Sequence, residues 1–129
     1  MNSKCKMAVA ALAGAALGGV LISGLKAQAK PPVYAVIDIS ETMDVDGYVK
    51  AVSAAEPKAT LSMGGRFVIR TNKAIHLDGS AQPNRFVMIA FDNEEKAKAW
   101  YNSKAIQDVN AVRMKTAKSR AFLVDGLIN

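Results

Sequence analysis

Residues Gly64 to Arg70 have the sequence GGRFVIR, which joins a helix-terminating signal to a short strand. A glycine pair suits the positive-φ backbone that commonly ends a helix. Because side chains alternate across a strand, Arg66, Val68 and Arg70 are expected on one face and the two apolar residues between them on the other. The segment therefore predicts the end of a helix, followed at once by a strand with one polar face.

The sequence on either side of this segment predicts three helical segments. One helix is expected from an N-cap at Asp44 to the glycine pair, because apolar residues recur there at helical spacing. Pro57 is expected to kink or restart it. Asp92, followed three residues later by a glutamate, forms a capping box for a second helix. Ser103 can cap a third helix that runs to about Ala117.

The strands and helices alternate in an order that predicts the fold. Four strands are expected at Val33–Ile39, Arg66–Arg70, Arg85–Phe91 and Arg120–Val124. The order is therefore β-α-β-β-α-β, with the second helix broken in two. This order is typical of the ferredoxin-like arrangement, an α+β fold with a four-stranded antiparallel sheet. Residues 30–129 are expected to form a single domain of this kind.

The first 29 residues have the pattern of a targeting segment. Lys4 and Lys6 precede an uncharged apolar run from Met7 to Leu25, and Ala27-Gln28-Ala29 follows it. This pattern is typical of a secretory signal peptide. We therefore expect residues 1–29 to be cleaved from an exported bacterial protein, which is periplasmic or secreted. The run has 19 residues, close to the ~20 that span a bilayer. An uncleaved anchor is therefore the alternative, and only then is a membrane a partner.

The charge balance gives no support for nucleic acid binding. The chain has 17 Lys or Arg and 11 Asp or Glu, a formal net charge of +6. Loss of residues 1–29 removes three lysines and no acidic residue, which leaves 100 residues with a net charge of +3. They contain no block of like charges and no aromatic-rich basic stripe. We therefore expect no nucleic acid partner.

Few metal-binding or nucleophilic side chains are available. Cys5 is the only cysteine, and it would leave with the signal peptide, so the mature domain would have no disulfide and no thiol nucleophile. His76 is the only histidine, which excludes a site of several histidines within one chain. The glycine pair leads into a strand and not into a helix, unlike a phosphate-binding loop. The sequence thus predicts no metal and no cofactor, and it identifies no catalytic residue.

Several motifs together resemble one family across nearly the whole of residues 30–129. They are YAVIDI in the first strand, D-V-D-G-Y from Asp44, GGRFVIR from Gly64, LDG and P-N-R between Leu77 and Arg85, AWYNS from Ala99, and Arg113. The pattern is similar to the family catalogued as domain of unknown function 1330. The resemblance implies a dimeric α+β barrel, in which the sheets of two protomers face each other, and hence a homodimer. More distant relatives include cofactor-free oxygenases, lactone isomerases and haem-degrading enzymes, but the family itself has no agreed activity.

Polar side chains on the expected sheet are the first candidates for a ligand site. Alternation places Tyr34 and Asp38 on one face of the first strand, and Arg66 and Arg70 are expected on the same face of the sheet. The arginines have the planar fork that binds a carboxylate or similar anion. Alternatively, Asp38 neutralises an arginine across the sheet, and the cluster only fixes the register of the dimer.

Three further residues complete the candidate ligand site. They are Tyr101 and Arg113 on the later helices and His76 in the connection between the middle strands. The leading hypothesis is an exported homodimer that binds a small organic ligand, with anions among the candidates. One alternative is a cofactor-free enzyme of the oxygenase or isomerase type that uses Arg66, Tyr101 or His76. Another alternative is a structural or partner-binding module.

Overall fold

The computed structural model describes residues 30–80 and 82–128, and seven helices and strands follow one another within them. Their order is β1 (Val33–Thr42), α2 (Val45–Ser62), β2 (Arg66–Thr71), β3 (Arg85–Phe91), α3 (Glu94–Asn102), α4 (Lys104–Thr116) and β4 (Ala117–Asp125). This is the predicted β-α-β-β-α-β order, with the second helix divided into α3 and α4. The expected signal segment lies outside the described residues, so its cleavage stays a prediction.

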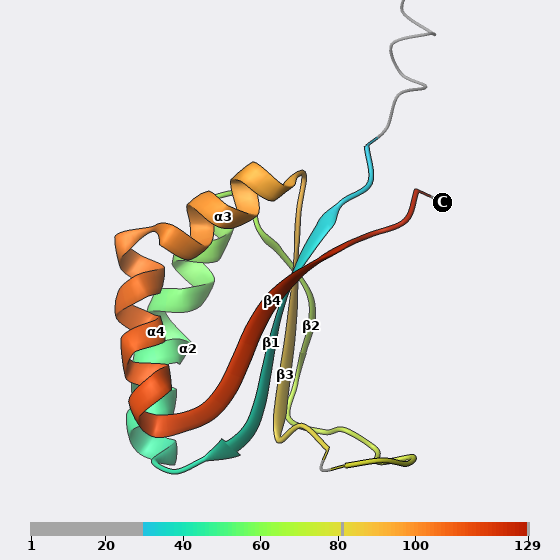
Figure 1. Ribbon diagram of the computed structural model, residues 1–129. Coiled ribbons are helices and arrows are strands. Elements are labelled where there is room, and N and C mark those ends of the chain that lie inside the picture. The colour runs from blue at the N-terminus through green and yellow to red at the C-terminus, as the bar shows by residue number, and fades with distance from the viewer. Residues whose placement is uncertain (1–29, 81, 129) are drawn as a thin grey trace, which may run out of the picture. The chain divides into compact units, whose positions relative to one another are not determined.

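The four strands form one antiparallel sheet in the order β2-β3-β1-β4. The helices α2, α3 and α4 lie on one side of this sheet, as Figure 1 shows. No helix of the described part covers the opposite side, which we call the open face and which carries Tyr34, Val36 and Asp38 of β1. The strand order and the one-sided helical layer confirm the ferredoxin-like α+β fold.

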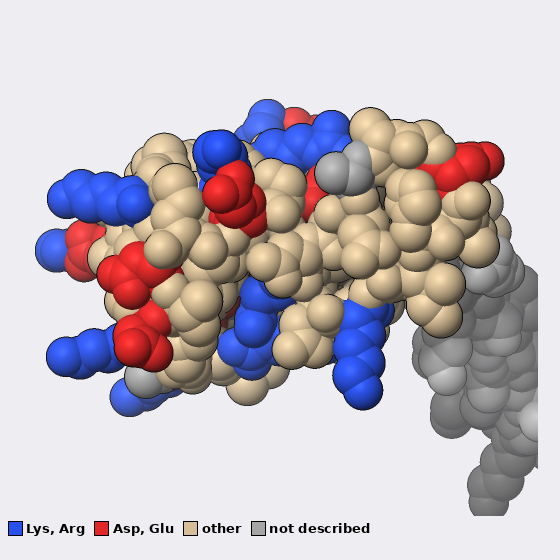
Figure 2. Space-filling view, turned by 90° about the horizontal axis from the view of Figure 1, so that it is seen from below, with Lys and Arg blue, Asp and Glu red and all other residues tan. Residues whose placement is uncertain are grey.

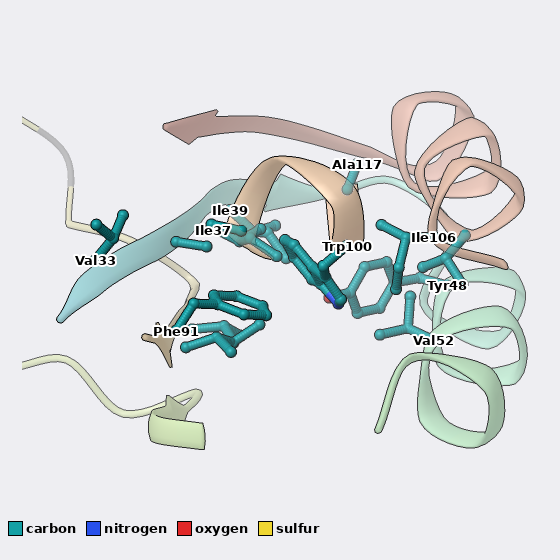
Figure 3. Packing of buried hydrophobic residues seen from close by; sticks show 14 residues of the cluster. Val33, Ile37, Ile39, Tyr48, Val52, Phe91, Trp100, Ile106 and Ala117 are labelled. Atoms are coloured by element: carbon teal, nitrogen blue, oxygen red, sulfur yellow. The ribbon is translucent and has the colours of Figure 1, made fainter. Parts of the chain in front are cut away.

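The hydrophobic core lies between the sheet and the helices. Every second residue of β1 is buried there: Val33, Ala35, Ile37 and Ile39. Trp100 of α3 lies between these residues and the side chains of α2 and α4 (Figure 3). Its indole nitrogen donates a hydrogen bond to Oγ1 of Thr60 over 3.0 Å, so the one polar atom of this ring is satisfied. The predicted packing of the apolar face of the first strand against the helices is therefore confirmed.

Helix α2 begins and ends as the sequence predicts but is not interrupted. Oδ1 of the N-cap Asp44 accepts a hydrogen bond from the backbone nitrogen of Gly47 over 3.0 Å. Gly64 has a φ of 82°, the left-handed conformation expected after a helix. Of the two predicted effects of Pro57, the restart was wrong, because α2 is one helix of 18 residues that contains the proline, and the kink stays a prediction. Val52 before the proline and Thr60 after it are both buried, so packing holds both halves in one helix.

The two later helices differ from the predicted boundaries at one cap. Asn93 caps α3, since its side chain accepts from the backbone nitrogen of Lys96 over 2.9 Å. The predicted cap, Asp92, instead binds Lys96 and Arg66 through its carboxylate. Ser103 caps α4 as predicted. β4 then begins directly at the end of α4 and is longer than the sequence indicated.

A β-bulge in β2 changes which face each arginine occupies. Arg66 pairs with Ala90 of β3, on the open face, whereas Arg70 pairs with Val87, on the helix side. The register shifts between Phe67 and Ile69, and the extra residue reverses the alternation beyond it. The prediction that Arg66, Val68 and Arg70 share one face was therefore wrong. Asp38 also does not neighbour Arg66, because β3 lies between their strands.

Candidate functional site

The polar side chains of the open face are paired within the protomer. Arg120 of β4 lies directly opposite Asp38, and its Nε donates to Oδ2 of Asp38 over 3.0 Å. Arg66 forms its ion pair with Asp92, just after β3, over 3.3 Å. Asp38 therefore neutralises an arginine across the sheet, as the structural alternative proposed, but the arginine is Arg120. Among the residues that the structure describes, these contacts leave no group of free charges on the open face that resembles an anion site.

The rest of the open face is largely apolar. Tyr34 is half-buried between Ala90 and Val124 of the neighbouring strands. Val36 is fully covered by its neighbours, with 3% of its surface exposed. Three apolar side chains nearer the edges remain more open: Ile69, Phe122 and Val124. This face therefore has the composition of an interface more than of a ligand pocket.

Three arginines and one glutamate come together on the helix side of the sheet. Arg70 lies near the end of β2, Arg85 begins β3, Arg113 comes from α4 and Glu56 from α2. Each arginine acts electrostatically on the carboxyl group of Glu56. We call these four residues the arginine cluster. Arg70 and Arg85 also line an open recess of about 310 Å³ with the two residues that follow Arg70.

Aromatic rings support the two arginines that line the recess. The guanidinium carbon of Arg70 lies 5.3 Å from the centre of the Phe67 ring. That of Arg85 lies 5.7 Å from the centre of the Tyr48 ring. A guanidinium over an aromatic face is stabilised by the negative face of the ring. The rings therefore contribute to holding both planar forks at the recess without using the hydrogen-bonding groups of the arginines.

The other two members of the arginine cluster are buried. Glu56 is 3% exposed and Arg113 is 5% exposed. Burial raises the pKa of Glu56 above its usual value of 4.5, and the three arginines only partly offset this effect. Burial likewise raises the pKa of the Tyr48 phenol, which also lies within reach of the cluster. The environment of Glu56 thus favours its protonated form more than water does.

Several polar atoms in and beside the cluster have no protein partner. Nε of Arg85, Nε of Arg113 and Nδ2 of Asn110 are buried and make no hydrogen bond. None of the ion pairs among the described residues involves Arg70, Arg85 or Arg113. Buried donors without an acceptor cost roughly 1–3 kcal/mol each. The arrangement supplies donors and positive charge to a further acceptor, which the protein itself does not provide.

The sequence predicted two members of this cluster and missed two. Arg70 and Arg113 were candidate site residues, whereas Arg85 and Glu56 were not. A signal for Glu56 was present, because it follows Tyr48 and Val52 at four-residue intervals on the buried face of α2. A carboxylate on the core-facing side of an amphipathic helix is unusual and indicates either a buried partner or a ligand.

Two other predicted residues lie away from the cluster. Tyr101 lines a mostly apolar hollow of about 230 Å³ between α3 and the strands β1 and β4, together with Trp100 and Leu123. His76 is exposed in the connection between β2 and β3. This connection extends from the lower end of the sheet toward the open face (Figure 1). The structure therefore distributes the candidate residues over the open face, the arginine cluster, the hollow and a loop.

The described residues contain neither a metal cluster nor a membrane span. No group of three or more histidine, cysteine, aspartate or glutamate side chains in residues 30–80 and 82–128 is placed to hold a metal ion. In the same residues, no helix combines the length and the apolarity that crossing a bilayer requires.

Figure 2 shows acidic and basic side chains intermixed on the helix side of the domain.

The fold and the cluster define a ferredoxin-like α+β domain that has an arginine-rich recess on the helix side of its sheet. A family model described as domain of unknown function (DUF1330) matches residues 32–127. The chain belongs to this family, as its motifs indicated. No curated protein matches it.

Solved structures are similar to the chain at low sequence identity. A protein of unknown function from Rhodopseudomonas palustris has a TM-score of 0.60 and 12% identity, over 84% of this chain and 93% of that one. A protein from Nitrosomonas europaea, provisionally assigned as an antibiotic biosynthesis monooxygenase, has a TM-score of 0.54 and 14% identity, over 75% and 99%. A dimeric ferredoxin-like protein of unknown function from Thermobifida fusca has a TM-score of 0.54 and 12% identity, over 74% and 92%. At these identities the likeness concerns the fold.

Proposed function

We propose that this chain forms a homodimer and binds a small organic anion at the arginine cluster of each protomer. The observation that carries the proposal is the excess of buried, unpaired cationic donors. Three guanidinium groups act electrostatically on a single carboxyl group, and Nε of Arg85 and Nε of Arg113 have no acceptor among the described residues. An anion bound in the recess would accept hydrogen bonds from Arg70 and Arg85, which line it, and would balance part of the charge of the cluster.

Charge balance argues for an external anion over a purely structural cluster. With Glu56 ionised the cluster has a net charge of about +2, and with Glu56 protonated about +3, since each arginine keeps its proton. A buried arginine without a counter-ion is destabilising, because its charge has lost its water. A structural cluster would be expected to pair Glu56 closely with Arg113, yet no such ion pair is formed among the described residues.

The recess limits the size and the chemistry of the anion. Its volume of about 310 Å³ suits a small metabolite, and Thr71 and Asn72 add polar groups to its wall. Arginine forks match the two oxygens of a carboxylate, so a small carboxylic acid is the favoured class. Phosphate is the competing class, because it presents a similar pair of oxygens.

The homodimer is supported by the open face and by the fold. Phe122 and Val124 of β4 are 42% and 39% exposed on a face that no helix covers in the described part. A second copy related by two-fold symmetry would cover the same apolar residues on both protomers. The similar protein from Thermobifida fusca is dimeric, which fits this assignment.

Residues 1–29 are proposed to direct export and to be cleaved. The lysines at positions 4 and 6, the apolar run and the Ala27-Gln28-Ala29 pattern support this proposal. The ligand would then be one that is encountered outside the cytoplasm.

Thermal unfolding in the presence of anions tests the binding proposal. Pyruvate, oxalate, benzoate and phosphate are added in turn, and a ligand that binds only the folded protein raises the unfolding midpoint. Arg85→Met and Arg70→Met should abolish the shift. Arg66→Met is the matched control, because Arg66 is a β2 arginine paired with Asp92 on the other face of the sheet. No shift with any of these anions, or equal shifts in all variants, would remove the cluster as the binding site.

A further inference from the structure

The position of Glu56 inside the arginine cluster has a consequence for the proposed anion site. We infer that binding of the anion is coupled to uptake of one proton by Glu56, so that the site captures its ligand more tightly as the pH falls. The inference rests on the proposed function, because it concerns the same cluster. It adds a regulatory property that anion binding alone does not require.

The charged and titratable groups around Glu56 come from four elements. Arg70 of β2, Arg113 of α4 and Arg85 of β3 are its cationic neighbours, and Tyr48 is the titratable group on α2 itself. These neighbours keep their protonation state near neutral pH, since arginine does not titrate and burial raises the pKa of Tyr48. Within the cluster, Glu56 is therefore the group whose charge can change.

The geometry places the anion and the carboxylate in competition for the same cations. Arg70 and Arg85 line the recess and also act on Glu56. An anion paired with these arginines would partly neutralise the charge that stabilises ionised Glu56, and its own charge would repel the carboxylate. Both effects favour the protonated form of Glu56, whose 3% exposure leaves it little water as an alternative source of stabilisation.

The direction of the coupling follows from the two protonation states. In the free protein, burial already raises the pKa of Glu56 above 4.5, and a bound anion would raise this pKa further. Between the free and bound pKa values the protein takes up a proton on binding, and the affinity falls as the pH rises. Above both values the affinity becomes independent of pH again, at its weaker limit.

Isothermal titration calorimetry with pyruvate measures the coupling directly. Titrations in two buffers with different heats of ionisation, repeated from about pH 5 to about pH 8, give the number of protons taken up with each ligand. For the wild type we expect an uptake between zero and one proton, and a Kd that rises with pH by at most about tenfold per pH unit. Pyruvate itself stays ionised over this range, so its own titration does not contribute.

Two glutamate variants separate the role of Glu56 from general charge effects. Glu56→Gln copies the shape of the protonated form, so it should bind with no proton uptake and with a Kd that does not change with pH. Glu95→Gln is the control, because Glu95 is an exposed residue of α3. It should behave as the wild type.

The outcomes distinguish failure of the coupling from failure of the site. Pyruvate binding by the wild type without proton uptake, or an unchanged pH dependence in Glu56→Gln, would overturn the coupling and leave the anion site standing. Absence of binding by pyruvate, oxalate, benzoate and phosphate alike would remove the site and the coupling together. If Glu56→Gln does not fold, pyruvate binding by the wild type without proton uptake still overturns the coupling.

Discussion

Arg120 and Asp38 lie directly opposite each other on β4 and β1, and Nε of Arg120 donates to Oδ2 of Asp38 over 3.0 Å. The two partners differ in environment, because the side chain of Arg120 is 73% exposed and that of Asp38 only 17%. The arginine therefore keeps much of its hydration, whereas the carboxylate depends on the pair.

Loss of the arginine should accordingly destabilise the protein more than loss of the charge on the aspartate. Arg120→Met leaves a half-buried carboxylate without its partner, and we expect a cost of about 1 kcal/mol in the free energy of unfolding. The double variant Arg120→Met with Asp38→Asn should recover part of that loss. Urea denaturation of the wild type, both single variants and the double variant measures the pair energy, and additive effects would show that the contact is not stabilising.

The hydrogen bond from Trp100 to Thr60 should contribute measurably to stability. Thr60→Val keeps the shape of the side chain but removes Oγ1, the acceptor that lies 3.0 Å from the indole nitrogen. The buried donor would then be unsatisfied, and we expect a loss of roughly 1–3 kcal/mol in the free energy of unfolding. Chemical denaturation measures this loss. A change below about 0.5 kcal/mol, the range of neutral surface substitutions, would contradict the assignment.

The prediction from sequence succeeded for helices and strands whose residue pattern has a clear periodicity. The alternating residues of β1 predicted its buried face correctly, because burial of apolar surface depends on which side of the element each residue occupies. The helical spacing predicted α2 as a helix but its buried face only in part, since Tyr48 and Val52 are buried whereas Val45 and Val49 of the same pattern are exposed. The order of these elements was then sufficient for the fold. Pro57 shows the limit of local rules, since packing on both sides of it maintained a helix that propensity alone would have interrupted.

The candidate site was harder to predict, because it depends on a bulge and on residues from four elements. RFVIR has three apolar residues between two arginines, and nothing in that pattern marks an extra residue in the pairing with β3. The bulge moves Arg70 to the helix side, next to Glu56, while Arg66 stays on the open face. To predict that the four residues of the arginine cluster lie together, one must know the strand register and the helix packing. The periodicity of the sequence gives neither.

The pH dependence of stability offers a test of the buried glutamate without any ligand. The folded-state pKa of Glu56 is raised by burial above 4.5, so the folded protein holds this proton more tightly than the unfolded chain does. As the pH rises from the unfolded pKa through the folded pKa, the contribution of Glu56 to stability should decrease and then level off. In Glu56→Gln this decrease should be absent. Urea midpoints across this pH range, compared between the two proteins, measure the difference, and parallel curves would contradict it.

The open face should be the dimer interface. Phe122→Asp places a charge among exposed apolar residues of β4, and we expect it to convert a dimer into a monomer because a charge would then have to be buried against the apolar face of the second protomer. Leu61→Asp is the matched control, since Leu61 is an exposed apolar residue on α2, on the other side of the sheet. Light scattering on residues 30–129 should give twice the monomer mass for the wild type and the control, and the monomer mass for Phe122→Asp. A wild type that is monomeric at micromolar concentration would count against the barrel.

The final prediction concerns the amino-terminal segment. The lysines at positions 4 and 6, the apolar run and the small residues Ala27 and Ala29 predict cleavage after Ala29. The glycines and alanines of the run lower its apolarity, which favours cleavage over a permanent anchor. Amino-terminal sequencing of the protein purified from an expressing bacterium should therefore begin at Lys30. Ala27→Leu with Ala29→Leu should block processing, because the peptidase requires small side chains at these positions. Recovery of the intact wild-type chain from the membrane fraction would instead establish the anchor, and a membrane would then be a partner of the domain.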